Sequence, residues 1–405
     1  MKMTRLSLLA GLTLAALAGT SWALAPDSGE TLADLVEVQK YGRAIHIMAM
    51  LMVGFGFLMV FVKRYGRSAV TATYLLVSLA IPVYFLKDKL GLLGAPNADI
   101  DSLILAEFAA ASLLICAGAV LGRLKMNQYL LLGLLFVPCY AAGEWIVLRG
   151  GLGLIPAGHV IDTGGSIVIH AFGALFGLAA MLSLTPPRHF AASIQSDATS
   201  DRFSMVGSMV LWVFWPSFCA ALVAPAEVPK TAVNVILALC ASTLATYGAS
   251  LFLRRKLAIA DIANAALAGG VAIGSACDKA SPGAAFVIGL LAGGLSTFGF
   301  AVIQPRLQSL LKKTDTCGVL YLHGLPGLLG SVAALFSVAG INKGAQLAGI
   351  AVAACIALVS GLVAGKIVSV LGARTAPYED AEEFEIDDRG EGVPAWVKVE
   401  RVLEK

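Results

Sequence analysis

Two histidines lie at matching places in a stretch of sequence that occurs twice, 153 residues apart. His170 follows Asp162 by eight residues, and His323 follows Asp315 by the same interval. Each copy begins Asp-Thr-x-Gly and has a glycine seven residues after its histidine. A neutral imidazole offers one hydrogen-bond donor and one acceptor and exchanges protons near neutral pH. Because ionisable groups in apolar segments are costly and usually functional, the pair favours one site for a small polar solute or a proton.

Both histidines should lie at the same depth of a membrane. The copies fall in the fifth and tenth apolar segments, so they run in opposite directions and form an inverted repeat. Eight helical residues advance about 12 Å, nearly to the midplane of a core about 30 Å thick. We therefore expect a buried His170–His323 pair that stays neutral or shares one extra proton. A single membrane histidine more often only links helices, whereas the matched pair favours transport.

The two aspartates stand where these segments begin. A carboxylate at a helix N-terminus caps free backbone N–H groups and complements the helix dipole. Capping is therefore the simpler interpretation of Asp162 and Asp315. It is compatible with a second one, in which the carboxylates fix the backbone around a conduction path.

The composition indicates a membrane protein made of helices. Hydrophobic residues make up 58% of the 405 residues and charged residues only 14%, and the mean hydropathy is +0.83. A soluble core does not need this composition, whereas a polytopic helical protein does. The 43 glycines suit close helix–helix contacts in lipid. Cationic residues are scattered over short loops, so we expect a lipid bilayer around the chain and no nucleic-acid partner.

After residue 40 the chain contains about eleven apolar segments, each near the length that a bilayer requires. Their approximate limits are 43–62, 69–88, 102–122, 129–149, 163–184, 203–223, 231–252, 258–277, 282–302, 318–338 and 345–371. The loops on one side carry 13 lysines and arginines, against 6 on the other side. This bias places the N-terminus outside and the C-terminus in the cytoplasm.

The two ends differ from the apolar body, 24–374. Residues 1–23 combine Lys2 and Arg5, an apolar run and a small residue at Ala23, as in a cleaved signal peptide. A retained N-terminal helix is the alternative. Residues 375–405 form an acidic cytoplasmic tail, which we expect to be solvated, with contact to a cytoplasmic partner as the alternative.

Several motifs together resemble the ammonium transporter (Amt)/Rh superfamily, and its Rh branch most. They are the two Asp…His segments, Val53–Met59 with Lys63–Gly66, Trp215–Phe218 and Asn264–Ala272. The resemblance covers the whole membrane domain. It implies an all-α membrane protein with 11 transmembrane helices, arranged as an inverted 5+5 repeat plus a long C-terminal helix. It also implies a homotrimer with a separate pore through each protomer.

The resemblance also assigns the parts of this pore. They are an outer vestibule, two stacked phenylalanines, a narrow apolar path past the twin histidines, and an inner vestibule. Phe108 and Phe218 match the phenylalanine gate, although as bare sequence they would be ordinary packing residues. Glu107 and Glu144 resemble vestibule carboxylates that concentrate a cation, with a surface-facing position as the alternative.

Other positions depart from the family pattern or have no role in it. Leu222 stands where the Amt branch has a hydroxyl residue, which favours a low-affinity channel over tight ammonium capture. His46 stands where Rh relatives commonly have a carboxylate, and we assign it no role. His159 and His189 fall in loops, where we expect them to be solvated.

The resulting hypothesis is an Rh-type ammonia channel in the inner membrane of a bacterium. Ammonium would lose its proton at the outer vestibule, and ammonia would cross past the histidines. One alternative is an ammonium sensor that signals through its tail, and another is a membrane redox protein with haem or metal on the two histidines. The sequence shows no nucleotide-binding loop, HExxH or nucleophile motif, so we expect no hydrolytic or pumping chemistry. The channel hypothesis therefore includes no enzyme activity, cofactor or metal.

Overall fold

The computed structural model describes residues 28–385, and every regular element in this range is a helix. The expected signal peptide at 1–23 and the last residues of the tail, 386–405, lie outside the described part. The chain divides into two units, Met1–Gly42 and Arg43–Lys405. The second unit contains the histidine repeat and all the helices after α2.

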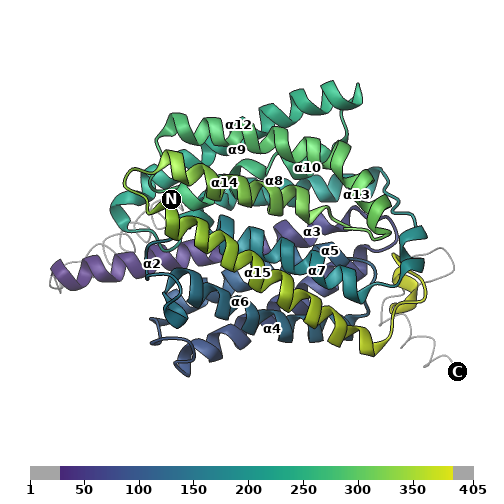
Figure 1. The fold of residues 1–405 in the computed structure, drawn as a ribbon, viewed down its shortest axis with the longest axis horizontal. Helices are drawn as coiled ribbons and strands as arrows, with labels where there is room; N and C mark the ends of the chain where they lie inside the picture. Colours follow the sequence, from purple (N-terminus) through teal and green to yellow (C-terminus); the bar gives the residue numbers. More distant parts are fainter. Residues whose placement is uncertain (1–27, 386–405) are drawn as a thin grey trace, which may run out of the picture. The chain divides into compact units, whose positions relative to one another are not determined.

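The elements of the first half of the repeat are helices that follow one another along the chain (Figure 1). They are α2 (Ser28–Ala49), extended through α3 (Gly56–Leu58) to Phe61; α4 (Gly66–Lys89); α5 (Asp99–Val120); α6 (Met126–Leu148); and α7 (Phe172–Leu184), which continues the π-helical turn η5 (Ser166–Ala171).

The second half repeats this order. Its elements are α8 (Ala198–Cys219); α9 (Val228–Arg254); the short α10 (Ile259–Ala265) and α11 (Ala268–Ile273); α12 (Pro282–Phe298) with α13 (Gln304–Leu311); and α14 (Leu325–Ser337), which continues the π-helical turn η10 (Leu320–Gly324). The long α15 (Lys343–Val368) follows and packs along α7 (Figure 1). Equivalent contacts recur in the two halves, since α4 packs on α6 as α9 packs on α12, and α5 on α7 as α11 on α14.

Ten helical stretches of the described chain are long and apolar enough to cross a membrane. The eleventh predicted span is α8, which is less apolar because Asp201 and Arg202 lie in its first turns. The predicted span at 258–277 is broken between α10 and α11, at residues 266–267. The predicted all-α fold is confirmed, and the break in this span is the main local difference.

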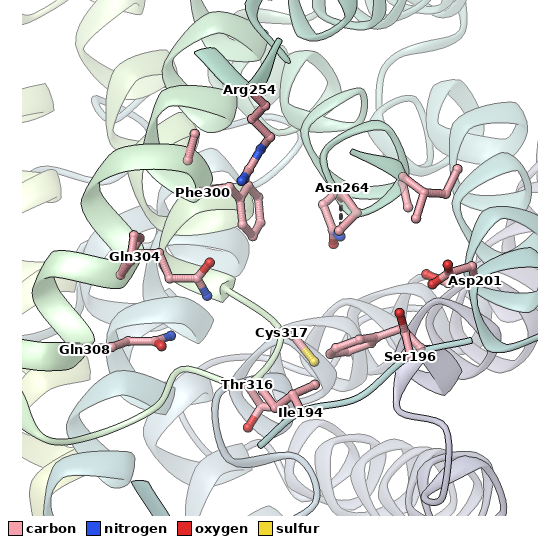
Figure 2. Close-up of a pocket in the computed structure, with 17 residues that line it drawn as sticks. Ile194, Ser196, Asp201, Arg254, Asn264, Phe300, Gln304, Gln308, Thr316 and Cys317 are labelled. Carbon is pink, nitrogen blue, oxygen red and sulfur yellow. Dashed lines mark hydrogen bonds between the residues drawn. The ribbon is translucent and has the colours of Figure 1, made fainter. Parts of the chain in front are cut away.

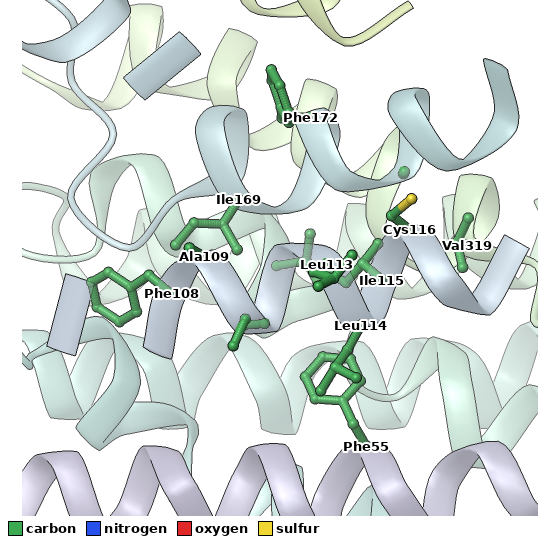
Figure 3. Packing of buried hydrophobic residues seen from close by; sticks show 14 of the residues in the cluster. Phe55, Phe108, Ala109, Leu113, Leu114, Ile115, Cys116, Ile169, Phe172 and Val319 are labelled. Atoms are coloured by element: carbon green, nitrogen blue, oxygen red, sulfur yellow. The ribbon is translucent and has the colours of Figure 1, made fainter. Parts of the chain in front are cut away.

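Helix α5 forms the central wall of the fold. Nearly every side chain from Ile104 to Leu121 is buried, because the helix is surrounded by α4, α6, α7 and the π-helical turn Met50–Phe55. Figure 3 shows the side chains of Phe108, Leu114 and Cys116 leaving this helix in different directions. A helix that is apolar on all sides is typical of a span buried within a bundle.

Helices α9 and α12 approach closely because glycine faces the contact. A Cβ atom at Gly293 would lie 2.4 Å from the backbone oxygen of Ser242, whereas one at Gly294 would meet nothing within 4 Å. We expect Gly293→Ala to destabilise the protein by about 1–3 kcal/mol through overpacking. The adjacent Gly294→Ala serves as the control and should be neutral or slightly stabilising, by at most about 1 kcal/mol. Equal thermal unfolding temperatures of the two variants would contradict this packing argument.

In the described part of the acidic tail, 375–385, Tyr378 and Asp380 are buried against the helical body, whereas Glu383 and Glu385 are exposed, as expected of a solvated tail. The Tyr378 N–H donates to the Gly122 carbonyl at 2.8 Å. The Asp380 carboxylate accepts hydrogen bonds from the backbone N–H groups of Arg67 (3.1 Å) and Ser68 (2.8 Å), at the first turn of α4. A carboxylate in this position satisfies free N–H groups that the helix leaves at its start.

Candidate functional site

The structure brings the two repeat histidines together. Their Nδ1 atoms lie 3.2 Å apart, and the ring planes differ by only 7°. His170 is 2% exposed and His323 3% exposed. At this distance one Nδ1 carries a hydrogen and donates it to the other, so the pair makes one internal hydrogen bond.

Each histidine lies in a π-helical turn that opens its span. Gly165 and Gly318 precede these turns and have φ values of +78° and +67°, in the left-handed region that favours glycine. Each turn continues into an α-helix of 13 residues, α7 or α14. The repeat therefore extends beyond the histidines to the glycine, the turn and the helix. π-Helical turns are rare and occur most often at functional sites.

The two aspartates hold the start of these turns. The Asp162 carboxylate accepts hydrogen bonds from the backbone N–H groups of Ile167 at 3.0 Å and Val168 at 2.9 Å. The Asp315 carboxylate accepts from the N–H of Val319 at 3.0 Å. Both side chains thus make the capping interactions that the sequence suggested, and they fix the backbone just before each histidine.

Burial raises the pKa of the Asp162 carboxyl to about 6, against the usual 3.8, although its hydrogen bonds with Val168, Ile167 and Ser275 act in the opposite direction. The folded protein holds this proton more tightly than the unfolded chain does. The resulting stabilisation is fully present below the unfolded pKa of 3.8, and it is lost as the pH rises through the folded pKa of about 6. Relative to Asp162→Asn, we expect the wild type to gain up to about 3 kcal/mol between pH 6.5 and pH 4. Thermal unfolding of both proteins across this pH range measures the difference. Parallel pH profiles would contradict it.

The predicted phenylalanine gate is an aromatic pair on the side of His170. The rings of Phe108 and Phe218 have centroids 4.7 Å apart and are tilted by 48°, rather than stacked in parallel. Phe218 also lies 6.2 Å from the ring of His170. Trp215 stacks on His170 with centroids 5.6 Å apart. The Trp-Pro-Ser-Phe motif pointed to this region, but it gave no specific role to the tryptophan.

A cavity of about 400 Å³ opens beyond Phe108, and we name it the outer cavity after the orientation expected from the sequence. Its lining includes Glu144, Asp162, Leu222 and the cationic Lys279. Glu144 is only 5% exposed and accepts a hydrogen bond from the Tyr84 hydroxyl. The cavity therefore contains carboxylates, as the sequence suggested, together with a cation that the sequence analysis did not place there.

The structure does not bring Glu107 into this cavity. Its side chain is 1% exposed and lies on α5, next to the gate residue Phe108. Within residues 28–385 its Oε2 atom has no hydrogen-bond partner. Neither the vestibule position nor the surface position expected from the sequence matches this buried location.

Beyond His323 a narrow, mostly apolar cavity continues the path. Its volume is about 20 Å³, little more than a single water needs. Phe61, Asn264 and Cys317 line both this cavity and a wider one of about 440 Å³ (Figure 2). A wide cavity, the aromatic pair, the two imidazoles, a narrow apolar section and a second wide cavity therefore follow one another.

Two polar atoms of the stacked His170 and Trp215 rings are buried without a hydrogen-bond partner in the described part of the chain. They are Nε2 of His170 and Nε1 of Trp215. An unpaired buried polar group costs about 1–3 kcal/mol. A small solute that donates and accepts hydrogen bonds would remove this cost while it passes.

The other three described histidines lie away from this path. His46 Nδ1 is 2.8 Å from the Ser217 hydroxyl. His159 is exposed, as expected of a loop residue. His189 is instead 2% exposed, which corrects the prediction that it is solvated. Its Nε2 donates to the carbonyl of Arg374 at 3.0 Å, just before the tail begins.

Known proteins that are similar to this chain belong to one family. The model of the Ammonium Transporter Family matches residues 35–391. The chain is 40% identical to human ammonium transporter Rh type B over 336 residues, which cover 80% of this chain and 70% of that one. It is 42% identical to the rabbit (Oryctolagus cuniculus) Rh type B protein over 305 residues, or 72% of this chain and 64% of the rabbit protein. The aligned part is thus slightly under two thirds of that relative's length.

Solved structures show the same fold. The chain is similar to Nitrosomonas europaea Rh50, described as one of the Rhesus protein family of channels, with a TM-score of 0.85 and 50% identity. This likeness covers 92% of this chain and 97% of the other. A sensor Amt protein is similar in fold alone, with a TM-score of 0.68 and 15% identity.

Proposed function

Because the chain belongs to the ammonium transporter family, in its Rh branch, we propose that it is a channel that conducts ammonia across a membrane. It is a multi-pass membrane protein of a transporter family rather than an enzyme. In the proposed mechanism, ammonium enters the outer cavity and gives up its proton near Phe108 and Phe218. Ammonia then passes His170 and His323 and regains a proton on the other side.

The paired imidazoles carry this proposal. They are buried and in contact, they lie between two wide cavities, and His170 keeps one unpaired nitrogen. Ammonia is both a hydrogen-bond donor and an acceptor, so it can bond to either the N–H or the bare nitrogen of a neutral imidazole. Two positive imidazolium rings at 3.2 Å would repel each other away from water, which favours the neutral pair.

Selectivity follows from the cost of removing water. Burying an ion without compensation costs far more than burying a neutral polar molecule, which loses only its hydrogen bonds. The narrow section beside His323 is lined mainly by apolar side chains, including Phe55, Leu114 and Ile115. A potassium or sodium ion would find no charge there to replace its water. Ammonia avoids most of this cost because its proton stays outside.

The outer cavity suits capture at low affinity. Asp162 and Glu144 lie in its lining, and the Lys279 ammonium in the same lining is paired with Asp278 at 2.5 Å. Leu222 also lies in this lining and adds no polar contact. An apolar side chain at this position of an open cavity favours a channel that follows the ammonium gradient rather than one that captures ammonium tightly.

We also propose that three copies assemble, with the N-terminus outside and the C-terminus in the cytoplasm of a bacterial inner membrane. The support for this orientation is the distribution of lysines and arginines, since the loops on one side carry 13 of them and those on the other side carry 6. The support for a trimer is the membership of the family. Light scattering on the protein in detergent, corrected for the detergent, should give three times the mass of one chain.

Stopped-flow measurement of internal pH tests the proposed function. Proteoliposomes that receive an inward ammonium gradient should become alkaline inside faster than protein-free liposomes, because ammonia enters and binds protons there. Equal rates with and without the protein would rule out ammonia conduction.

A further inference from the structure

The wide cavity beyond His323 contains polar side chains that the proposed function does not use. In this section we call it the inner cavity, because the basic loops lie on its side of the protein. Figure 2 shows these side chains around an open centre. They are Ser196, Asp201, Ser204, Arg254, Asn264, Gln304, Gln308 and Thr316.

The one arginine of the inner cavity is neutralised within its wall. Arg254 donates from Nε to Asp261 at 2.7 Å and from Nη2 to the other carboxylate oxygen at 3.0 Å. Asp261 is 1% exposed, so this pair is fixed in the wall. Two parallel bonds between a guanidinium and a carboxylate are the strong form of this interaction. Arg254 therefore gives the cavity little positive charge.

The amide side chains of the inner cavity use their nitrogen atoms on the protein itself. Gln304 and Gln308 donate from Nε2 to the carbonyl oxygen of Asp315, at 3.3 Å and 3.2 Å. Asn264 donates from Nδ2 to the carbonyl of Ala260 at 2.9 Å. Each amide keeps its oxygen as an acceptor. Each amide also keeps a second N–H, so the cavity wall offers acceptors as well as donors to a bound molecule.

Asp201 leaves the inner cavity with a net negative charge. It lies in the first turn of α8, where the helix dipole stabilises an ionised carboxylate. Its carboxylate forms no ion pair with any residue of the described chain, and it lines the cavity opposite Gln304 and Gln308 (Figure 2). One uncompensated carboxylate with several neutral acceptors suits a small cation that carries N–H donors.

We propose that the inner cavity is a second ammonium site, in which the Asp201 carboxylate holds the ion at the cytoplasmic end of the path. This inference rests on the proposed function. Ammonia that leaves the narrow section takes a proton from water in the open cavity. A new N–H bond forms, an O–H bond of the water breaks, and the hydroxide passes to the solvent. In the opposite direction, Asp201 gathers ammonium before it is deprotonated.

Oriented membrane vesicles test this site with ammonium chloride as the probe. Right-side-out and inside-out vesicles are distinguished by the accessibility of a C-terminal tag, and an internal dye reports pH after mixing. With ammonium well below half-saturation, we expect Asp201→Asn to lower the initial rate about fivefold when ammonium meets the face of the basic loops. From the opposite face the rate should change by less than about twofold. Added salt should reduce the defect, because it screens the wild-type carboxylate.

Asp197→Asn is a matched control at the same helix end. Asp197 accepts from the N–H groups of Thr199 and Ser200 and caps α8, but it does not line the inner cavity. Asparagine caps a helix about as well, so this variant should keep the wild-type rate from both faces. Asp201→Glu should restore most of the rate.

Two results would overturn the second site while leaving ammonia conduction in place. In one, Asp201→Asn conducts like the wild type from the face of the basic loops. In the other, it loses the same fraction from both faces, as a general folding defect would cause. If wild-type vesicles conduct no better than vesicles from cells without the protein, both the proposed function and this site are wrong.

Discussion

Replacing both His170 and His323 with leucine is expected to slow ammonia conduction about thirtyfold. Ammonia gives up hydrogen bonds to water when it enters the narrow section, and the two imidazoles replace some of them. Each lost bond costs roughly 1 kcal/mol, so two add about 2 kcal/mol to the barrier. Stopped-flow pH measurement in proteoliposomes, with equal protein content, gives the ratio of rates.

The controls separate this effect from a fault in folding. His46→Leu removes a histidine that pairs with Ser217 away from the path, so its rate should stay close to that of the wild type. Single leucine variants at the two repeat histidines should fall between the wild type and the double variant. A double variant that conducts ammonia selectively at the wild-type rate would remove the imidazoles from the mechanism.

Arg374→Met is expected to cost the protein about 3 kcal/mol of stability. Arg374 is 0% exposed and donates to Glu383 at 2.8 Å and to Glu382 at 3.2 Å. Its guanidinium also lies over the ring of Tyr65, 5.1 Å from the centroid. Methionine fills much of the space but leaves two carboxylates without their partner. The thermal unfolding temperature in detergent should fall by several degrees.

Arg64→Met is the matched control for this prediction. Arg64 pairs with Glu379 in the same tail at 3.2 Å, but its side chain is 68% exposed. An exposed ion pair contributes about 0–1 kcal/mol, so this variant should unfold close to the wild type. If both variants unfold at the same temperature, Arg374 does not hold the tail segment in place.

The contact between the two buried histidines could be predicted from the sequence, because the spacing of residues in the repeat determines it. The interval from each aspartate to its histidine sets the depth, and the odd number of segments sets the direction. The same offset of 153 residues relates Gly165 to Gly318 and α7 to α14. The π-helical form of both turns has no comparable signal, since apolar residues occupy a π-turn and an α-helix alike.

Features that depend on the closure of distant segments could not be predicted. His189 lies in a loop, and only the fold shows that Arg374, 185 residues further along the chain, lies against it. In the sequence, Asp201 looks like an ordinary residue at the start of a helix. Nothing in the sequence predicts that it lines a cavity together with Arg254 and Gln308. Glu107 is buried on α5 because neighbouring spans surround that helix. The spacing of residues within one span does not show which other spans will surround it.

Simultaneous recording of internal pH and membrane current in the reconstituted protein tests the central claim most directly. An uncharged molecule that crosses past neutral imidazoles raises the internal pH and carries no charge. We therefore expect rapid alkalinisation with no ammonium-dependent current at a clamped voltage. A current that grows with ammonium and carries about one charge for each molecule transported would contradict passage of neutral ammonia.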